Sequence, residues 1–552
     1  MKSLTLRSMV IGGIGSVIIT ASSLFTSLKL SSLPWPIMFV CLSSMFVLKA
    51  LGKTNPHEIN VAHTAMSAGA MVAGGLAFTM PAILILDPNA KIDYFEIGLI
   101  TVLGTVLGLV FTWILRKYFI EDNEYPFVLG EAASEIIKAG DKGFKGAKNL
   151  FLGMGFSGIF TFIRDYFQAF PSLISSKYMA SIGGSTGIWI SPMLMSMGYM
   201  LGFRSTMVWL LGGMIGEIGI IGFSSWFALC DVDTASQIKS SLGIGLMIGV
   251  GIGMIIKSAI RFIKKLSQKS EKKMQLLNFA ENKRTIYNCT IKIVLCTIIA
   301  SLFTDFNIGT MLLIVIGCLI TTIMSSESVG FTGVNPMEVF AILIMLFISV
   351  TVSLDTTALI YIAIIIAIAS GLTGDVMNDF KAGYVFDTNP KHQLVAQSVG
   401  SIIGAVVSVL GMYFIISAYG RDIFGSLEFP SAQSMQVAAM IGGNYMMVPL
   451  LIGVVVAIIL YLSNAHAITL GLGVYLPFYF AITVSIGGVL SKLIKERKSE
   501  VTENKNDIAS KDESPSKCER ARDFCDTFMP GLLAGESLMG VIIAIIVFIV
   551  AM

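Results

Sequence analysis

The sequence predicts an all-α polytopic membrane protein with about 15–16 transmembrane helices in two parallel repeats, some of them interrupted or re-entrant. Three observations predict this fold: the composition, the length of the apolar segments, and short motifs that recur in both halves. Of 552 residues, 55% are hydrophobic and 13% are charged. Soluble domains carry about 25% charged residues, so we expect this chain to lie largely in lipid.

The apolar segments are long enough to cross a bilayer, because a hydrocarbon core about 30 Å thick requires about 20 apolar residues per helix. They are continuously apolar and lack the alternation of membrane-barrel strands, which excludes a barrel. The clearest predicted spans are Val10–Leu28, Val61–Leu86, Phe95–Leu115, Leu150–Phe170, Met207–Phe223, Leu394–Ile416, Val437–Leu462, Ile468–Leu490 and the last one, Leu538–Val550.

Two charged linkers separate groups of these segments. The first, Lys257 to Lys292, contains ten Lys and Arg residues against Glu271 and Glu281. The second, residues 492–526, contains nine basic and nine acidic residues and precedes the last predicted span. Because basic linkers are retained in the cytoplasm, we expect both to be cytoplasmic.

This placement requires an even number of crossings between the two linkers, yet seven candidate spans lie there. One candidate is therefore not a complete crossing. The interruption is expected in Val339–Ile368 or in Ser431–Leu462. In the second segment, Gly442, Gly443 and Pro449 are expected to separate a re-entrant half-helix from a full span.

Short motifs recur about half a chain apart. Asn55-Pro56-His57-Glu58 is matched by Asn335-Pro336-Met337-Glu338. Three further pairs keep their order: Glu124-Tyr125-Pro126 with Glu428-Phe429-Pro430, Gly104-x3-Gly108 with Gly400-x3-Gly404, and Gly212-Gly213 with Gly487-Gly488. The order predicts two repeats, residues 1–286 and 287–552. Because substrates of duplicated transporters bind between the repeats, the recurrence indicates a transporter.

The Asn-Pro pair of each copy is a predicted helix break. Proline lacks the amide hydrogen of a helix hydrogen bond, so it frees backbone carbonyls, which lipid tolerates only beside protein or cavity water. Asn55, Pro56, Asn335 and Pro336 are therefore candidate substrate-binding residues. The alternative is a capped helix entry in an ordinary loop, in which the acidic residue of the motif stabilises the first turn.

Carboxylates within apolar segments are the candidates for proton coupling, since ionisable residues at membrane depth usually face the protein interior and carry function. Glu58 and Glu338 are the first candidates, followed by Asp165 and Glu327. The alternative role is structural ion pairing. For Arg164-Asp165 we expect each residue to pair with another helix, because adjacent residues point to different helix faces.

One stretch, Gly374 to Tyr384 (GDVMNDFKAGY) followed by Asn389-Pro390, resembles the signature loop of the oligopeptide transporter (OPT) family in its bacterial branch, which is related to the yellow-stripe-like transporters. The resemblance covers nearly the whole chain and includes a duplicated architecture of about sixteen helices with a charged connector before the last. We expect the loop to act as a cytoplasmic gate or as a structural connector. Its signature residues are Gly374, Asp375, Asp379, Lys381, Gly383, Tyr384 and Pro390.

The resemblance implies a secondary active transporter that takes up short oligopeptides with protons by alternating access, or metal chelates as in the yellow-stripe branch. The chain lacks the longer Asn-Pro-Phe pattern of the eukaryotic peptide branch, so the motif does not choose between them. A peptide carboxylate needs a cation, and Arg204 and Lys381 are candidates for that role. We expect the proton gradient as energy source, no cofactor, and a bacterial plasma membrane.

Other functional classes fit the sequence less well. A passive channel would show a repeated filter loop or rings of charge. Serines at Gly155-Phe156-Ser157-Gly158 and Gly183-Gly184-Ser185, with His466 as a base, resemble those of an intramembrane serine protease. Glycine-flanked serines are, however, common at helix contacts. We therefore predict a protein that is not an enzyme, has no metal site and does not bind nucleic acid, and whose partners are its substrate and the bilayer.

Overall fold

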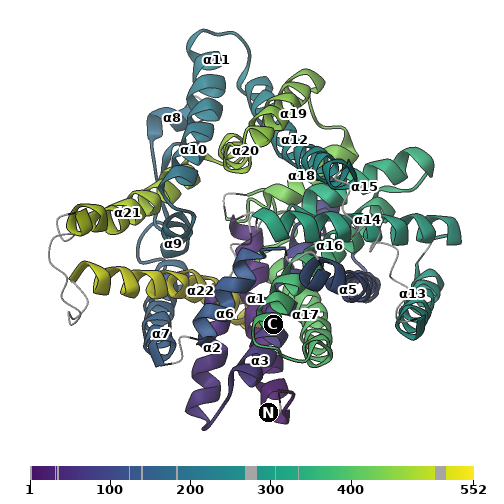
Figure 1. Ribbon diagram of the computed structural model, residues 1–552. Helices are drawn as coiled ribbons and strands as arrows, with labels where there is room; N and C mark the ends of the chain where they lie inside the picture. Colours follow the sequence, from purple (N-terminus) through teal and green to yellow (C-terminus); the bar gives the residue numbers. More distant parts are fainter. Residues whose placement is uncertain are drawn as a thin grey trace. The chain divides into compact units, whose positions relative to one another are not determined.

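The computed structural model describes residues 3–30, 33, 37–122, 125–138, 141–181, 184–267, 283–304, 306–332, 335–426, 428–503 and 517–551. Almost all of this part of the chain is helical (Figure 1). Its only strands, β1 (Leu173–Ser175) and β2 (Gly187–Trp189), form one antiparallel hairpin. The predicted all-α fold is confirmed.

Among the described residues, nine helices are long and apolar enough to cross a membrane: Leu6–Leu30, Pro56–Leu86, Tyr94–Glu121, Phe203–Trp226, Val232–Lys257, Ile308–Gly330, Thr356–Val385, Pro390–Tyr419 and Arg520–Val547. Shorter apolar helices are Val40–Ala50, Cys289–Ile299, Met337–Thr351, Met447–Leu462 and Phe478–Ile494. The chain is therefore polytopic, and the total of about 15–16 spans remains a prediction.

The chain folds into two compact units, each assembled from separate stretches of sequence. Unit 1 comprises residues 1–140, 254–444 and 544–552, and unit 2 comprises residues 141–253 and 445–543. Each unit therefore contains residues from both halves of the chain. The repeat boundary after residue 286 is not a boundary between these units and remains a prediction about duplication.

Unit 1 is built around the contact of two helices, α3 and α16, whose apolar spans are 89% and 83% buried. Helix α3 also packs against α1, α2 and α17, and α16 also packs against α14, α15 and α5. The helices of unit 1 are α1 (Leu6–Leu30), α2 (Ile37–Ala50), α3 (Pro56–Ala77), α4 (Ala82–Leu86), α5 (Tyr94–Arg116), η1 (Lys117–Asp122), α6 (Val128–Lys138), α13 (Lys283–Phe303), α14 (Ile308–Thr332), α15 (Met337–Thr351), α16 (Thr356–Val385), α17 (Pro390–Tyr419) and α18 (Ala432–Gly442).

Glycines on α17 allow it to lie directly on α3. A Cβ atom at Gly400 would be 1.9 Å from the carbonyl oxygen of Ala65, and one at Gly404 would be 2.4 Å from the Cα atom of Gly69. No side chain fits at these distances, so glycine is required. Small residues at four-residue spacing commonly permit such contact between membrane helices.

Glycines on α5 make the corresponding contact with α16. A Cβ atom at Gly104 would be 2.9 Å from the carbonyl oxygen of Ile365, and one at Gly108 would be 2.9 Å from that of Ala369. The contact of α5 with α16 therefore repeats the contact of α17 with α3, with the same spacing on both helices.

Unit 2 shows a second pair of matched contacts. A Cβ atom at Gly198 of α9 would be 1.9 Å from the carbonyl oxygen of Val484 on α21, and one at Gly473 of α20 would be 2.2 Å from that of Trp209 on α10. The helices of unit 2 are α7 (Asp141–Thr161), η2 (Phe162–Tyr166), α8 (Lys177–Ser181), α9 (Pro192–Leu201), α10 (Phe203–Met214), η3 (Ile215–Gly222), α11 (Phe223–Trp226), α12 (Val232–Ser267, which ends in unit 1), α19 (Met447–Leu462), α20 (Ala467–Tyr475), α21 (Phe478–Glu503) and α22 (Lys517–Ala551, which ends in unit 1).

The prolines of the Glu-Tyr-Pro and Glu-Phe-Pro motifs precede two similar turns. Phe127 and Ser431, which follow them, both have positive φ angles, 41° and 44°. The backbone NH of Phe127 donates to Gly330 O (3.0 Å), and that of Ser431 donates to Leu28 O (3.1 Å). Helices α6 and α18 then begin at the next residue, and each has 11 residues. These matched positions support a duplicated chain.

The Asn-Pro motif does not follow this correspondence. Asn55 caps α3, which begins at Pro56 and whose packing matches that of α16, whereas Asn335-Pro336 precedes α15. The two tetrapeptides therefore begin helices with different neighbours. Four-residue similarity is too short to identify equivalent positions in a chain rich in membrane helices.

Three predicted segments are interrupted. The region Val339–Ile368, one of the two places where an interruption is expected, is divided between α15, which ends at Thr351, and α16, which begins at Thr356. The predicted span Val437–Leu462 is divided at Gly443, where φ is 68°, between the end of α18 and the start of α19. This confirms the interruption expected in that region. The predicted span Ile468–Leu490 is divided before Pro477, between α20 and α21. Much of both charged linkers, residues 268–282 and 504–516, lies outside the described residues.

The prediction that the signature stretch forms a loop is wrong, because this stretch is helical. Residues Gly374 to Tyr384 belong to α16, which continues to Val385, and Pro390 begins α17. Only the four residues between these helices, 386–389, form the connection. The charged residues of this stretch indicated an exposed loop, but their polar groups are instead buried against neighbouring helices.

Candidate functional site

A buried polar cluster lies where α3, α16 and α17 meet in unit 1. We define the α3–α16 cluster as Asn60, His63, Thr64, Ser67, Asp375, Asp379 and Gln397. Each of these residues is at most 4% exposed. The four residues of α3 lie at spacings that place them on one helix face, and the two aspartates are one helical turn apart.

Asp379 is the centre of the contacts in this cluster. Its Oδ2 accepts a hydrogen bond of 2.7 Å from Ser67 Oγ, and its Oδ1 lies 3.5 Å from His63 Nδ1. Its backbone carbonyl accepts from Gln393 Nε2 at 2.7 Å. The hydroxyl of Ser67 therefore joins α3 to Asp379 of α16, and Asp375 lies one helical turn before Asp379.

Several polar atoms of the cluster have no hydrogen-bond partner within the described residues. They are Asp375 Oδ2, Asp379 Oδ1, both ring nitrogens of His63, Thr64 Oγ1, and both side-chain polar atoms of Asn60 and Gln397. A buried polar group without a partner costs about 1–3 kcal/mol. Such a concentration indicates a place for water, a proton or a bound ion.

Unit 2 contains a buried charge network of a different kind. Arg164 lies on η2 and is bonded by Nε to Asp165 Oδ1 at 2.6 Å and by Nη2 to Glu536 Oε1 at 3.0 Å. Glu536 also accepts from Ser191 Oγ at 2.9 Å and from the backbone NH of Met193 at 2.9 Å. The Arg164 and Glu536 side chains are fully buried.

The coupling candidate Asp165 thus belongs to a compensated ion pair. The expectation that Arg164 and Asp165 each pair with another helix is wrong for Asp165, because the long Arg164 side chain folds back onto its neighbour. It is correct for Arg164, which also reaches Glu536 on α22.

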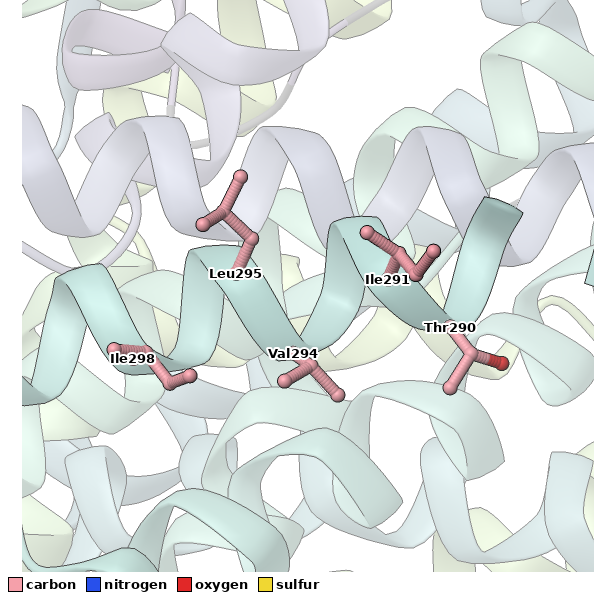
Figure 2. Close-up of a pocket in the computed structure, with 5 residues that line it drawn as sticks. All are labelled: Thr290, Ile291, Val294, Leu295 and Ile298. Carbon is pink, nitrogen blue, oxygen red and sulfur yellow. The ribbon is translucent and has the colours of Figure 1, made fainter. Parts of the chain in front are cut away.

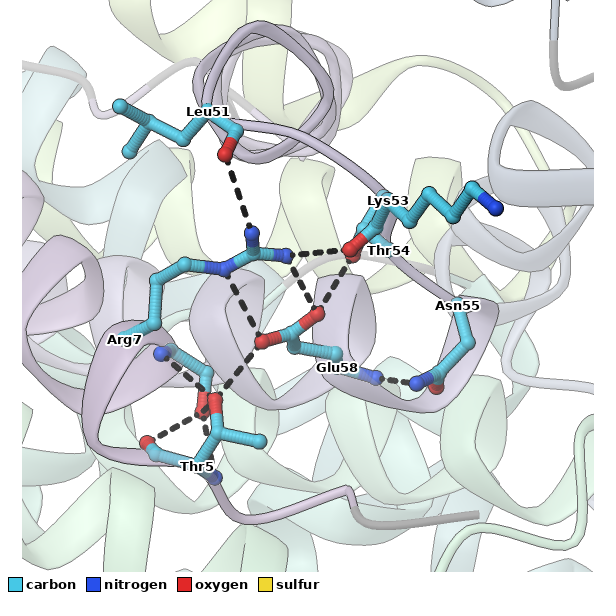
Figure 3. Close-up of polar contacts among 8 residues, drawn as sticks. Thr5, Arg7, Leu51, Lys53, Thr54, Asn55 and Glu58 are labelled. Carbon is cyan, nitrogen blue, oxygen red and sulfur yellow. Dashed lines mark hydrogen bonds and ion pairs between the residues drawn. The ribbon is translucent and has the colours of Figure 1, made fainter.

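Glu58, the first coupling candidate, is held in a network at the start of α3 (Figure 3). Arg7 of α1 donates to Glu58 Oε2 at 2.8 Å and to Oε1 at 3.2 Å. The hydroxyls of Thr5 and Thr54 each donate to this carboxylate at 2.7 Å. Asn55 caps the helix by accepting from the backbone NH of Glu58. The contacts therefore match the capped helix entry that the sequence left as the alternative.

The second Asn-Pro motif is less exposed. Asn335 Nδ2 donates to the backbone carbonyls of Ser370 and Gly371 on α16, at 3.0 and 3.2 Å. Pro336 occupies the N-cap position of α15, and Glu338 in the first turn is 8% exposed. Asn335 thus supports a tight contact with α16.

The remaining predicted residues lie apart from the cluster. Lys381 Nζ donates to Tyr125 O at 3.1 Å and lies 3.5 Å from Glu131 Oε1, so it links α16 to the start of α6. Arg204 is exposed near the start of α10 in unit 2, and Glu327 is partly buried on α14 in unit 1.

A family model for "OPT oligopeptide transporter protein" matches residues 3–547. The chain belongs to the OPT family. It is therefore a multi-pass integral membrane protein and a transporter, and not an enzyme. A "Putative oligopeptide transporter" of Haemophilus influenzae is 24% identical over 584 aligned positions, which cover 91% of this chain and 89% of that protein. "Metal-nicotianamine transporter YSL2" of Arabidopsis thaliana is 35% identical over 72 residues, 13% of this chain and 11% of that protein.

An apolar surface pocket of this OPT protein lies along α13 (Figure 2). It is lined by Thr290, Ile291, Val294, Leu295 and Ile298, all from the same helix. The four aliphatic side chains are 45–55% exposed. A surface of this composition suits lipid contact, and it offers no charged group to a peptide or chelate.

The sequence contained a signal for the α3–α16 cluster. Asp375 and Asp379 follow the long apolar run of Ile360 to Ala369 at helical spacing, without an intervening Gly-Pro or Asn-Gly turn. Continuing helix periodicity through them would have placed both on one face. The partners on α3 could not be found this way, because they depend on which helices touch.

Proposed function

We propose that this OPT-family protein is a secondary active transporter that couples uptake of short oligopeptides to proton entry by alternating access. The observation that carries the proposal is the α3–α16 cluster, in which Asp375 and Asp379 are buried without a Lys or Arg partner among the described residues. Acidic residues buried at membrane depth commonly serve as proton sites in carriers.

Two further observations support alternating access. The contacts of α17 on α3 and of α5 on α16 are matched, as are those of α9 on α21 and of α20 on α10. Transporters that alternate between two openings are commonly duplicated in this manner.

The bacterial relative suggests a bacterial plasma membrane as the location.

Proton-coupled transport of a metal chelate is the second candidate. It is favoured by the 72-residue similarity to a transporter named for a metal-nicotianamine substrate. A chelate would need polar and charged groups much like those that a peptide zwitterion needs.

The test is uptake by the purified protein in liposomes. Labelled peptides of two to six residues are supplied with and without an inward proton gradient, and ferric chelates are added as competitors. Accumulation above equilibrium only with the gradient supports the peptide symporter. Gradient-driven accumulation of the chelate supports the second candidate instead. If the substrate only equilibrates, with or without the gradient, transport is not coupled to protons and the protein is a passive channel.

A further inference from the structure

Asp375 and Asp379 lie one turn apart on α16, and both are at most 1% exposed. Two ionised carboxylates at this spacing repel each other, and in a site of low polarity the repulsion is strong. One proton bound by the pair removes it, as in other carboxylate pairs that share a site. The geometry therefore requires either a proton or a compensating cation.

Two basic side chains, one on α16 and one on α5, have other partners. Arg116 of α5 pairs with Glu121, and Lys381 pairs with Glu131. His63, 3.5 Å from Asp379, is the basic group nearest the pair among the described residues. Besides the pair itself, the described titratable and charged groups on α16 or on helices packed against it are His57, Glu58, His63, Tyr94, Glu96, Arg116, Lys117, Tyr118, Glu121, Glu131, Lys138, Cys318, Glu327, Glu338, Tyr361, Lys381, Tyr384, Lys391, His392, Tyr413 and Tyr419.

The atoms around the pair are suited to hold and release a proton. Ser67 Oγ already donates to Asp379. The amide of Gln397 and the ring of His63 are fully buried and have unpartnered polar atoms within the described residues. These groups can bond either form of the carboxyl, because amide, hydroxyl and imidazole groups can donate or accept.

We infer that Asp375 and Asp379, with Ser67 of α3, form the binding site of the coupling proton. This assignment rests on the proposed symport function and replaces Glu58 as the coupling residue. The step is a simple acid–base exchange: the proton joins a carboxylate oxygen on one side of the cycle and leaves to water on the other. Because α3 and α16 both contribute, protonation also changes how the two central helices attract each other.

An infrared titration tests the site without any substrate. The purified protein in lipid should show a protonated carboxyl band at a pH where exposed aspartates are ionised, because the two buried carboxylates cannot both be ionised at low cost, and the Asp375→Asn/Asp379→Asn variant should lack the part of this band that the pair contributes. Asp422→Asn, which removes an exposed aspartate of the same unit, should keep it. Absence of the band in the wild-type protein, or a band of equal size in the wild-type protein and the double variant, would overturn the assignment.

A transport assay separates coupling from substrate binding. In liposomes, Asp379→Asn should lose accumulation of labelled trialanine above equilibrium, yet should still exchange external labelled trialanine for internal unlabelled trialanine. Gradient-driven accumulation equal to that of Asp422→Asn would refute the assignment. Loss of exchange as well, in protein that is monodisperse, would also refute it, since the residue would then be needed for more than the proton.

A third arm replaces the proton gradient with an inward sodium gradient. Sodium-driven accumulation in the wild-type protein would contradict a proton site and would make the pair a sodium site. If the wild-type protein moves neither peptides nor chelates under any gradient, the proposed function fails, while the infrared titration still decides whether the pair binds a proton.

Discussion

Two sites of buried carboxylates, one in each unit, differ in whether a cation accompanies them. In unit 2, Glu536 and Asp165 share the guanidinium of Arg164, and the donors around them use most of their acceptor positions. In unit 1, Asp375 and Asp379 are as buried as Glu536, but the groups that the structure places beside them are a hydroxyl, an amide and an imidazole.

This difference separates a structural charge from a functional one. A buried ion pair with complete hydrogen bonding is strongly destabilised when one partner is removed. A buried acid without a counter-charge destabilises the fold instead, so its presence calls for another reason. Proton binding supplies that reason for unit 1, whereas the network of unit 2 holds α22 against η2.

The largest expected effect is the loss of the counter-charge in unit 2. Arg164→Met leaves Glu536 buried and uncompensated, so we expect a loss of about 3–5 kcal/mol of stability. Thermal unfolding of the purified protein in detergent measures it. Arg204→Met, which removes an exposed arginine of the same unit, is the matched control. Equal unfolding temperatures for the two variants would show that the network is not structural.

In unit 1, removal of the buried charges is expected not to lower the stability of the protein. Asp375→Asn/Asp379→Asn removes buried charges that lack a Lys or Arg partner among the described residues, so stability should be unchanged or should rise by about 1–3 kcal/mol, the usual cost of a buried polar group without a partner. The same unfolding experiment measures this change. A loss as large as that of Arg164→Met would contradict the distinction between the two sites.

A third prediction concerns the close helix contacts at glycine, which both units contain. Gly400→Ala in unit 1 and Gly198→Ala in unit 2 would each place a Cβ atom 1.9 Å from a backbone carbonyl oxygen. Overpacking of this kind costs about 1–3 kcal/mol, and we expect similar losses in both. Gly155→Ala, which has no heavy atom within 4 Å of its added Cβ, is the control. If Gly400→Ala unfolded at the same temperature as Gly155→Ala, the close contact of α17 with α3 would be refuted.

The smallest expected effect is that of Glu58→Gln. Glu58 bonds Arg7, whose side chain is 30% exposed, and a partly solvated ion pair contributes about 1 kcal/mol or less. We expect a small loss of stability and gradient-driven uptake like that of the wild-type protein. Uptake that no longer responds to the gradient would restore Glu58 as the coupling residue.

The sequence predicted the fold class and the interruption near Gly443 because apolar length and helix breakers are local properties. It also identified the paired glycines, such as Gly104 and Gly400, that the matched helix contacts use. The functional cluster was not predicted. Asp375 and Asp379 were assigned to a loop because charged residues after an apolar run usually leave the membrane, and their neighbours on α3 are more than 300 positions away.

The choice of Glu58 as a coupling candidate shows the same limit of prediction from sequence. Glu58 was selected for its place in an apolar region beside a proline, but its partner Arg7 comes from the start of another helix. Whether a buried carboxylate is compensated depends on tertiary contacts, which a pattern of residue types along one helix does not contain.

The most direct measurement of the central claim follows protons and peptide together. Liposomes that contain the protein and an internal pH-sensitive dye, without any initial gradient, receive external trialanine. The account predicts that the interior acidifies as the peptide enters, and that Asp379→Asn abolishes this acidification. Entry of the peptide with no change of internal pH, or acidification that is undiminished in Asp379→Asn, would contradict it.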